Sequence, residues 1–345
     1  MITLDDVAKQ AGVSTSTVSI VVNNRHVRGV SVSPATRERV LHVAREMGYT
    51  PNSLARAVAT GKNRVLGFIK DDLAAELAMR IMVGAQQECE IADYLIKPFQ
   101  LSHPAIASDL VRKCLGQRVA GIIVVNLPDD ALAIVLHEAK TAEVPVVMVD
   151  SPSPNASCIQ ITSDAEQGVR LMCGHLVEQG HKRIAFIGGP ADSVVSQERK
   201  RIFRDACLEY GLDIREDMIV DTSWGETDIV KAAVAPLLAR PVEHRPTALF
   251  CAGDAIAMMS VKTARRCGLR VPKDVSVTGY SNASYAYLCD PALTTVAQDF
   301  VEMGRIAVRH VLALAADKDC AAKSAIVKVP TSLVVRESTW GPDWV

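Results

Sequence analysis

The sequence predicts an α/β protein with a small all-α region at its N-terminus, and three observations support this fold class. From residue 64 onward, short runs of β-branched residues alternate with longer amphipathic segments, which is the pattern of parallel sheets joined by helices. Before that point, apolar residues recur at helical spacing. The chain has 345 residues, too many for one ordinary core, so two or three domains are expected.

Residues 3–23, TLDDVAKQAGVSTSTVSIVVN, predict two short helices joined by a tight turn. From Leu4 to Ala11 the apolar side chains fall at positions i, i+3, i+4 and i+7, which places them on one helical face. Gly12 can end this helix in a left-handed conformation, and Ser14 can cap the start of the second helix. The segment therefore has the pattern of a helix-turn-helix.

The second of these helices has an apolar side and a polar side. The apolar side is made of valines: Val18, Val21 and Val22. The outward positions hold three hydroxyls and one aliphatic group: Thr15, Ser16, Ser19 and Ile20. A helix of this width enters the major groove of DNA, where such groups reach base edges. The same spacing also fits a helix pair that only packs, so the pattern alone leaves both interpretations open.

A third helix is predicted after a polar connection. Ser33 can cap it, Pro34 suits its first position, and Gly48 can end it. Pro51 and Asn52 then begin a helix of about eight residues, a length that is marginal in water until something packs on it.

Charge is unevenly distributed along the chain. Of the 38 basic and 39 acidic residues, nine basic and four acidic ones lie in residues 1–64, so the remaining 281 residues hold 29 basic against 35 acidic. A basic N-terminal region on an acidic body fits a phosphate-binding module attached to a part that does not bind nucleic acid. A merely solvated basic face is the alternative.

Seven strands are expected in the larger part of the chain, and several end at polar residues. The strands are residues 65–70, 93–99, 119–125, 144–150, 183–189, 248–253 and 275–280. The polar ends are Asp71 and Asp72, Asp150, 188–190, Gly253 with Asp254, and Ser281 with Asn282. In open α/β sheets, ligands bind outside the carboxyl ends of the strands. We therefore expect a ligand site at these ends.

Other classes of protein are disfavoured. No segment approaches the roughly 18 uninterrupted apolar residues of a membrane span and none resembles a signal peptide, so we expect a cytoplasmic protein. The nine cysteines are scattered without a CxxC pair, which favours neither a disulfide framework nor a zinc site. Nucleophile-elbow, P-loop and dinucleotide-binding motifs are absent, so no catalytic residue, cofactor or metal is expected.

The motifs TLDDVAKQAGVSTSTVS, ATRERV and GYTPN closely resemble the N-terminal headpiece of the LacI/GalR family of bacterial transcription regulators. GHKRIAFIGGP, GLRVPKDVSVTGY, PALTTVAQD and LVVREST resemble the family's second half. The resemblance implies a two-lobed periplasmic-binding-protein-like core with parallel sheets, whose chain crosses between lobes near residues 162–164, 290–298 and 325–329. It divides the chain into a headpiece (1–50), a hinge helix and linker (51–63), an N-subdomain (64–163 with 298–327) and a C-subdomain (164–297 with 328–340).

The resemblance also implies a repressor that binds a near-palindromic operator in double-stranded DNA as a homodimer. The implied base contacts are Thr15, Ser16 and Ile20. The implied phosphate contacts are Ser14, Thr17, Ser19, Asn23 and Arg25, and the other headpiece and hinge positions are Thr3, Asn52, Ala55 and Val58. Ile20 replaces an arginine common in the family, so it offers only apolar contact, and Val58 stands where a leucine usually enters the minor groove.

A small-molecule effector, a sugar or a related metabolite, is implied for the cleft between the lobes. The matching positions are Asp72, Asp150, Arg199, Gly253, Ser281 and Gln298. Gly253 and Ser281 replace a common asparagine and aspartate, and Ile202 stands where glycine is usual, which weakens the expectation of a simple sugar. Arg199 could instead form a structural salt bridge. A solute-binding protein without a transcriptional role is the alternative function, against which the attached headpiece argues.

Overall fold

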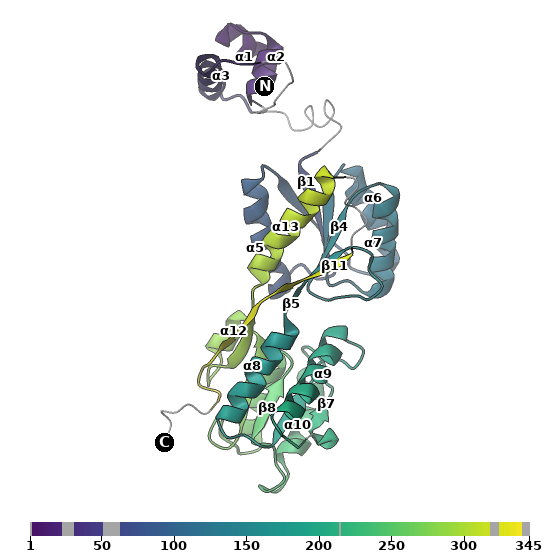
Figure 1. Ribbon diagram of the computed structural model, residues 1–345, viewed down its shortest axis with the longest axis vertical. Coiled ribbons are helices and arrows are strands. Elements are labelled where there is room, and N and C mark those ends of the chain that lie inside the picture. Colours follow the sequence, from purple (N-terminus) through teal and green to yellow (C-terminus); the bar gives the residue numbers. More distant parts are fainter. Residues whose placement is uncertain (1, 23–30, 51–62, 214, 318–323, 340–345) are drawn as a thin grey trace. The chain divides into compact units, whose positions relative to one another are not determined.

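The computed structural model describes residues 2–22, 31–50, 63–213, 215–317 and 324–339. The chain divides into two compact units, residues 1–64 and 65–345, each with its own core (Figure 1). No helix among the described residues is long and apolar enough to cross a membrane.

The first unit is a bundle of three helices, as predicted. They are α1 (Leu4–Ala11), α2 (Thr15–Val22) and α3 (Pro34–Glu46). Valines at the centre of each helix are buried, and they meet in one small core: Val7, Val18, Val21 and Val40, with Ala8, Ala11 and Ala44. The apolar stripes read from the sequence therefore face one another.

Each predicted helix boundary in this unit has a local cause. Gly12 ends α1 with φ +64°, a left-handed conformation that glycine adopts at little cost. The Ser14 hydroxyl accepts a hydrogen bond from the backbone N–H of Thr17 at 3.2 Å and so caps α2. Ser33 caps α3 in the same way, with Pro34 at the first position, and Gly48 follows the helix with φ +65°.

The second unit contains two six-stranded sheets. The sheet of the part that we call the N-lobe has the order β11-β5-β4-β3-β1-β2, and all its pairs are parallel. The sheet of the C-lobe has the order β12-β10-β9-β8-β6-β7, with β12 antiparallel to β10. The N-lobe strands are β1 (Val65–Lys70), β2 (Leu95–Gln100), β3 (Gly121–Val125), β4 (Val146–Val149), β5 (Ile159–Ser163) and β11 (Ala325–Val329). The C-lobe strands are β6 (Ile184–Ile187), β7 (Ile219–Val220), β8 (Ala248–Cys251), β9 (Ser276–Ser281), β10 (Thr294–Gln298) and β12 (Thr331–Val334).

Helices cover both faces of each sheet, which leaves most strands apolar along their whole length (Figure 1). In the N-lobe, α5 (Glu76–Ile91) and α13 (Phe300–Ala316) cover one face, and η1 (Pro104–Ile106), α6 (Ala107–Gly116) and α7 (Asp129–Thr141) lie on the other. In the C-lobe, α8 (Ala165–Glu178) and α9 (Val194–Glu209) cover one face. The remaining C-lobe elements are η2 (Glu216–Met218), α10 (Thr227–Leu238), α11 (Asp254–Arg266) and α12 (Ser284–Leu288).

The chain passes between the lobes three times. The passages lie between β5 and α8, between β10 and α13, and between β11 and β12. The first passage, at residue 164, lies within the predicted range 162–164. The second and third, at residues 299 and 330, lie one residue past the predicted ranges 290–298 and 325–329. Because β11 and β12 belong to different sheets and are separated by one residue, the lobes are joined by short connections.

His181 gives the C-lobe an acid-sensitive core. Its Nδ1 lies 3.0 Å from the Thr247 hydroxyl and its Nε2 lies 3.1 Å from the Ser276 hydroxyl. The side chain is buried, and burial, helped by the nearby charge of His175, lowers its pKa from 6.5 to about 4. The unfolded chain therefore binds a proton at this residue between those two pH values and the folded chain does not.

We expect the free energy of unfolding to be highest above pH 6.5 and to fall by about 3 kcal/mol from this group as the pH drops to 4. Urea titrations at pH 7 and pH 4.5 measure this change. A His181→Gln variant should show a smaller acid loss than the wild type, while His137→Gln, on the exposed side of α7, should match the wild type. Equal acid loss in the wild type and His181→Gln would contradict the assignment.

Candidate functional site

The outward face of α2 is a cluster of hydroxyl groups. Thr15 and Ser16 are exposed, and Thr17, Ser19 and Ile20 are half-buried. The Ser14 hydroxyl lies 2.8 Å from that of Ser16 and 2.9 Å from that of Thr17. These side chains are thus held beside the N-terminus of α2, which is the end of a recognition helix that meets base edges.

The other headpiece positions are placed differently. Thr3 caps α1, and its hydroxyl donates to the Asp6 carboxylate at 2.7 Å, which lowers the pKa of Asp6. Five predicted positions lie outside the described residues: Asn23, Arg25, Asn52, Ala55 and Val58.

A second candidate site lies where the two lobes meet. A small polar pocket there is lined by Asp150 and Pro152 after β4, by Thr162 and Ser163 of β5, by Ala165 of α8, and by Val195, Glu198 and Arg199 of α9. The pocket therefore includes both lobes and the first passage between them. Of the six predicted effector positions, two line it directly, Asp150 and Arg199.

Arg199 is a buried cation held by neutral groups. Its Nη1 donates to the carbonyl oxygen of Ala252 at 2.7 Å, and its Nη2 donates to Oε1 of Gln298 at 3.3 Å. Its guanidinium carbon lies 3.7 Å from the ring centroid of Tyr280. Its Nε has no hydrogen-bond partner within the part of the chain that the structure describes. Among the described residues, Arg199 is therefore positioned by neutral acceptors and an aromatic ring, and its Nε–H is left as an unused donor.

Asp150 follows β4 in a left-handed conformation, with φ +82°. Burial raises the pKa of its carboxyl, and the positive charges of Arg199 and Lys70 act in the opposite direction. Lys70 is itself buried at the end of β1, where it pairs with Asp71. The pocket thus combines the carboxyl groups of Asp150 and Glu198 with the Arg199 guanidinium, and the charge of Lys70 acts on Asp150 from nearby.

Gln298 contacts residues of the N-lobe in addition to Arg199 of the C-lobe. Its Nε2 donates to the Ser163 hydroxyl at 2.7 Å, and its backbone carbonyl oxygen accepts from Nη2 of Arg80 in α5 at 3.3 Å. Arg199, Gln298 and Ser163 therefore form a chain of contacts from α9 through β10 to β5. A ligand that engages Arg199 would act directly on a contact between the lobes.

Ser281 and Gly253 border this edge of the C-lobe sheet. Ser281 donates to the buried Asp254 carboxylate at 3.3 Å, and Thr295 donates to the same group at 2.6 Å. Burial raises the pKa of Asp254, and the hydrogen bond from Thr295 is the main opposing influence. The Ser281 hydroxyl is therefore engaged within its own lobe.

Gly253 and Gly189 lie beneath the ring of Trp224, which is 39% exposed. A Cβ atom at Gly189 would come within 2.7 Å of that ring, and one at Gly253 within 3.5 Å. Trp224 therefore lies across the carboxyl ends of β6 and β8, where sequence reasoning did not place an aromatic. An aromatic beside a glycine in the loop after β7, SWG, was the available signal.

Asp72 is exposed in the loop after β1 and accepts a hydrogen bond from the backbone N–H of Ala74 at 2.9 Å. Among the described contacts, none joins it to the group around Arg199. The structure thus brings together Asp150, Arg199 and Gln298, and it leaves Asp72 apart from them.

Comparison with known proteins agrees with both parts of the chain. The family profile described as bacterial regulatory proteins, lacI family, matches residues 3–52, and a periplasmic binding protein-like domain profile matches residues 173–339. The HTH-type transcriptional repressor PurR of Aliivibrio fischeri is 32% identical over 320 residues, which cover 92% of this chain and 93% of that protein. Catabolite control protein A of Priestia megaterium is 31% identical over 345 residues, with 98% and 99% covered.

Among solved structures, the Lac repressor dimer bound to operator and the anti-inducer ONPF matches with a TM-score of 0.78 at 29% identity, covering 99% of each chain. These relatives confirm the predicted fold class and the prediction of a regulator in place of an enzyme. The chain belongs to the LacI family of bacterial regulatory proteins and is a DNA-binding transcription regulator.

Proposed function

We propose that the protein is an effector-controlled repressor that binds a near-palindromic operator as a homodimer. The proposal rests on one observation: two features occur in the same chain. The first is the face of α2 with its exposed hydroxyl groups, and the second is a two-lobed core with a polar pocket between its lobes. The relatives named as repressors support the direction of control, and the Lac repressor structure described as a dimer on its operator supports the assembly. Such a regulator acts in the cytoplasm, where the DNA is.

In this proposal the headpiece, residues 1–50, reads the operator through α2. Base edges are contacted by Thr15, Ser16 and Ile20. The phosphate contacts are Ser14, Thr17, Ser19, Asn23 and Arg25, with Thr3 at the start of α1. Residues 51–63, including Asn52, Ala55 and Val58, form the hinge, and the core divides into 64–163 with 298–327 and 164–297 with 328–340.

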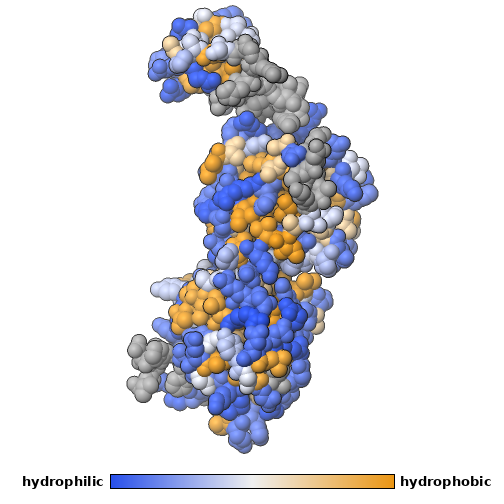
Figure 2. Space-filling model, viewed as in Figure 1, coloured by the Kyte–Doolittle hydropathy of each residue, from blue (hydrophilic) through white to orange (hydrophobic). Residues whose placement is uncertain are grey.

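The dimer surface that we propose lies along α5 and α12. Met79 and Val83 of α5 are 58% and 50% exposed, and Tyr287 and Leu288 of α12 are 70% and 77% exposed. Apolar side chains gather over α12 in Figure 2. Ser284 of α12 donates to the Glu76 carboxylate of α5 through its backbone N–H at 2.9 Å, so the two helices adjoin and offer one surface across both lobes.

The effector in this proposal is a small polar molecule with hydroxyl or carboxylate oxygens. Arg199 supplies an unused donor, Asp150 supplies an acceptor, and Trp224 supplies a flat apolar face. Because Gln298 bridges Arg199 to Ser163 of the other lobe, a ligand that binds one lobe arrangement better would shift the balance between arrangements. Gly253 and Ser281 stay proposed effector positions at the edge of the C-lobe sheet, and Asp72, which lies apart from Arg199, is proposed from the family resemblance alone.

A ligand screen tests the effector part of the proposal. The full-length protein is heated with sugars, sugar phosphates, nucleobases and small acids, each in excess, and the midpoint of unfolding is measured. A ligand at about 100 times its dissociation constant adds about 2.7 kcal/mol and raises the midpoint by several degrees. If no compound in these four classes raises the midpoint, the proposal that such a compound is the effector is wrong.

A further inference from the structure

The polar pocket between the lobes carries more negative than positive charge. Its lining includes two carboxyl groups, those of Asp150 and Glu198, and one guanidinium, that of Arg199. The carboxyl groups come from different lobes, because Asp150 follows β4 and Glu198 belongs to α9. When all three groups are ionised, the lining therefore has one negative charge in excess.

Glu198 lies on the face of α9 that meets the pocket. Val195, Glu198 and Arg199 are spaced i, i+3 and i+4, which places them on one side of the helix, and all three line the pocket. Glu198 is half-buried. Among the described residues, no hydrogen bond or ion pair engages its carboxylate. The fold thus holds a carboxylate at the pocket that these residues do not use.

Two cations near the pocket are engaged elsewhere. Lys200, the next residue of α9 after Arg199, pairs with Asp221 at 2.6 Å. Lys70, at the end of β1, pairs with Asp71. Both ammonium groups therefore have a carboxylate of their own, and neither pairs with Glu198.

Asp150 is the second carboxyl group at the pocket. Burial raises the pKa of this carboxyl, and the positive charges of Arg199 and Lys70 lower it, without a hydrogen bond from another described residue. A carboxylate that is taken out of water is unfavourable unless a cation or hydrogen-bond donors replace the water. A positively charged group of a ligand would supply both to Asp150.

The same region offers a hydrogen-bond donor and an aromatic face. The Arg199 side chain is buried, and its Nε–H has no partner among the described residues, so it is free to donate to an oxygen of a ligand. Trp224 lies over Gly253, directly after Ala252, whose carbonyl oxygen accepts from Arg199. The face of an indole ring attracts an ammonium group. These groups together suit a ligand that has a positive charge and an oxygen acceptor.

We propose that the effector carries a primary ammonium group and that Glu198 selects for it. This inference rests on the proposed effector site and names the chemical class of its ligand. The ammonium group binds to the carboxylates of Asp150 and Glu198, and a hydroxyl or carboxylate oxygen of the same molecule accepts from Arg199. Amino sugars and amino acids have both groups a few bonds apart. A neutral sugar of the same size would leave Glu198 without a cation.

Matched pairs of compounds test the need for a positive charge. The full-length protein is screened by thermal shift, and each hit is then titrated by calorimetry. The compounds are the hexosamines and the common amino acids, each beside the counterpart in which a hydroxyl replaces the ammonium group, such as glucose for glucosamine and lactate for alanine. We expect at least one amine to bind at least about tenfold more tightly than its hydroxyl counterpart.

Glu198→Gln removes the charge of the side chain and keeps its size. The affinity for the amine should fall by about tenfold or more, while the affinity for the hydroxyl counterpart should stay within about twofold. Glu209→Gln is the matched control, because Glu209 lies on the same helix, pairs with Arg170 and does not line the pocket. This control should bind the amine as the wild type does.

The results that would overturn the inference also separate it from the proposed effector site. If a hydroxyl compound binds at least as tightly as its amine and Arg199→Ala weakens that binding, the site is correct and the ammonium is not required. Unchanged amine affinity in a Glu198→Gln variant with wild-type unfolding midpoint would overturn the role of Glu198. If no compound of either kind binds, the proposed effector site fails and the inference fails with it.

Discussion

Arg199→Ala is expected to remove about half or more of the rise in unfolding midpoint that an effector produces in the wild type. The Arg199 guanidinium is buried, has one unused donor, and lies beside Asp150 in the pocket between the lobes. Hydrogen bonds to a charged group contribute about 1.5–3 kcal/mol each, so losing this group weakens binding by about 10- to 100-fold or more. Calorimetric titration with a ligand found in the screen measures the change in affinity.

A matched control lies two residues further along the same helix. Arg201 is exposed and pairs with Asp205 at 2.6 Å, so Arg201→Ala removes an arginine from α9 without touching the pocket. This control should bind the effector as the wild type does. If Arg199→Ala folds and binds the ligand with unchanged affinity, the effector does not use this pocket.

Gly84→Val is expected to destabilise the N-lobe by about 3 kcal/mol or more. A Cβ atom at Gly84 of α5 would come within 1.8 Å of the carbonyl oxygen of Val301 in α13. The contact is reciprocal, because a Cβ atom at Gly304 of α13 would come within 2.0 Å of the carbonyl oxygen of Ile81. Both neighbours are backbone atoms, so neither can move aside by changing a side-chain rotamer.

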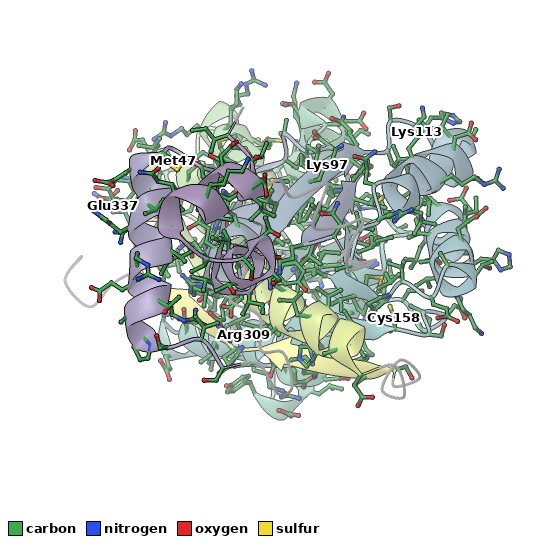
Figure 3. The ribbon with its side chains drawn as sticks, turned by 90° about the horizontal axis from the view of Figure 1, so that it is seen from above. Met47, Lys97, Lys113, Cys158, Arg309 and Glu337 are labelled. Atoms are coloured by element: carbon green, nitrogen blue, oxygen red, sulfur yellow. The ribbon has the colours of Figure 1, made fainter. Side chains whose placement is uncertain are left out.

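The α5 and α13 helices also carry surface contacts that a separation would break. Arg309 of α13, labelled in Figure 3, pairs with Glu88 of α5 at 3.0 Å.

Urea unfolding at pH 7 measures the free energy of unfolding that Gly84→Val loses, with Gly116→Ala as the control. A Cβ atom at Gly116, in the last turn of α6, would meet nothing within 4 Å. Similar stability of Gly84→Val and the wild type would show that these two helices do not approach so closely.

Local sequence was sufficient for the headpiece. Gly12, Ser14 and Ser33 act on residues within four positions of themselves, so the ends of α1, α2 and α3 follow from short-range rules. The predicted strands other than β2 are buried, and buried parallel strands are rich in apolar residues that a local pattern can show; β2 is largely exposed.

Five of the strands in the described residues were missed, and three of them lack that signal. β7 has only two residues, and β10 (TTVAQ) and β12 (TSLV) contain polar residues. Thr294 and Thr295 of β10 are fully buried, yet each makes side-chain hydrogen bonds that involve residues more than ten positions away. Contacts between distant segments thus determine that these residues form strands, and a local sequence pattern cannot show such contacts.

The pocket was predicted in part. Asp150, Arg199 and Gln298 were carried over from motifs, and the structure brings them together. Tyr280 under Arg199 and Trp224 over Gly253 were missed, since each contact joins residues far apart in the chain. The Ser281 hydroxyl was expected in the pocket, but its contact with Asp254 depends on how β9 packs on α11.

Selection of bound sequences from random double-stranded DNA tests the central claim most directly. The full-length protein is used at low salt, because phosphate contacts make binding weaken steeply as salt rises. A homodimer with two α2 helices predicts one enriched near-palindromic sequence, and a Thr15→Ala, Ser16→Ala variant should lose or change that enrichment. Failure of the wild type to enrich any common sequence, or the same enrichment by the variant, would contradict operator recognition through α2.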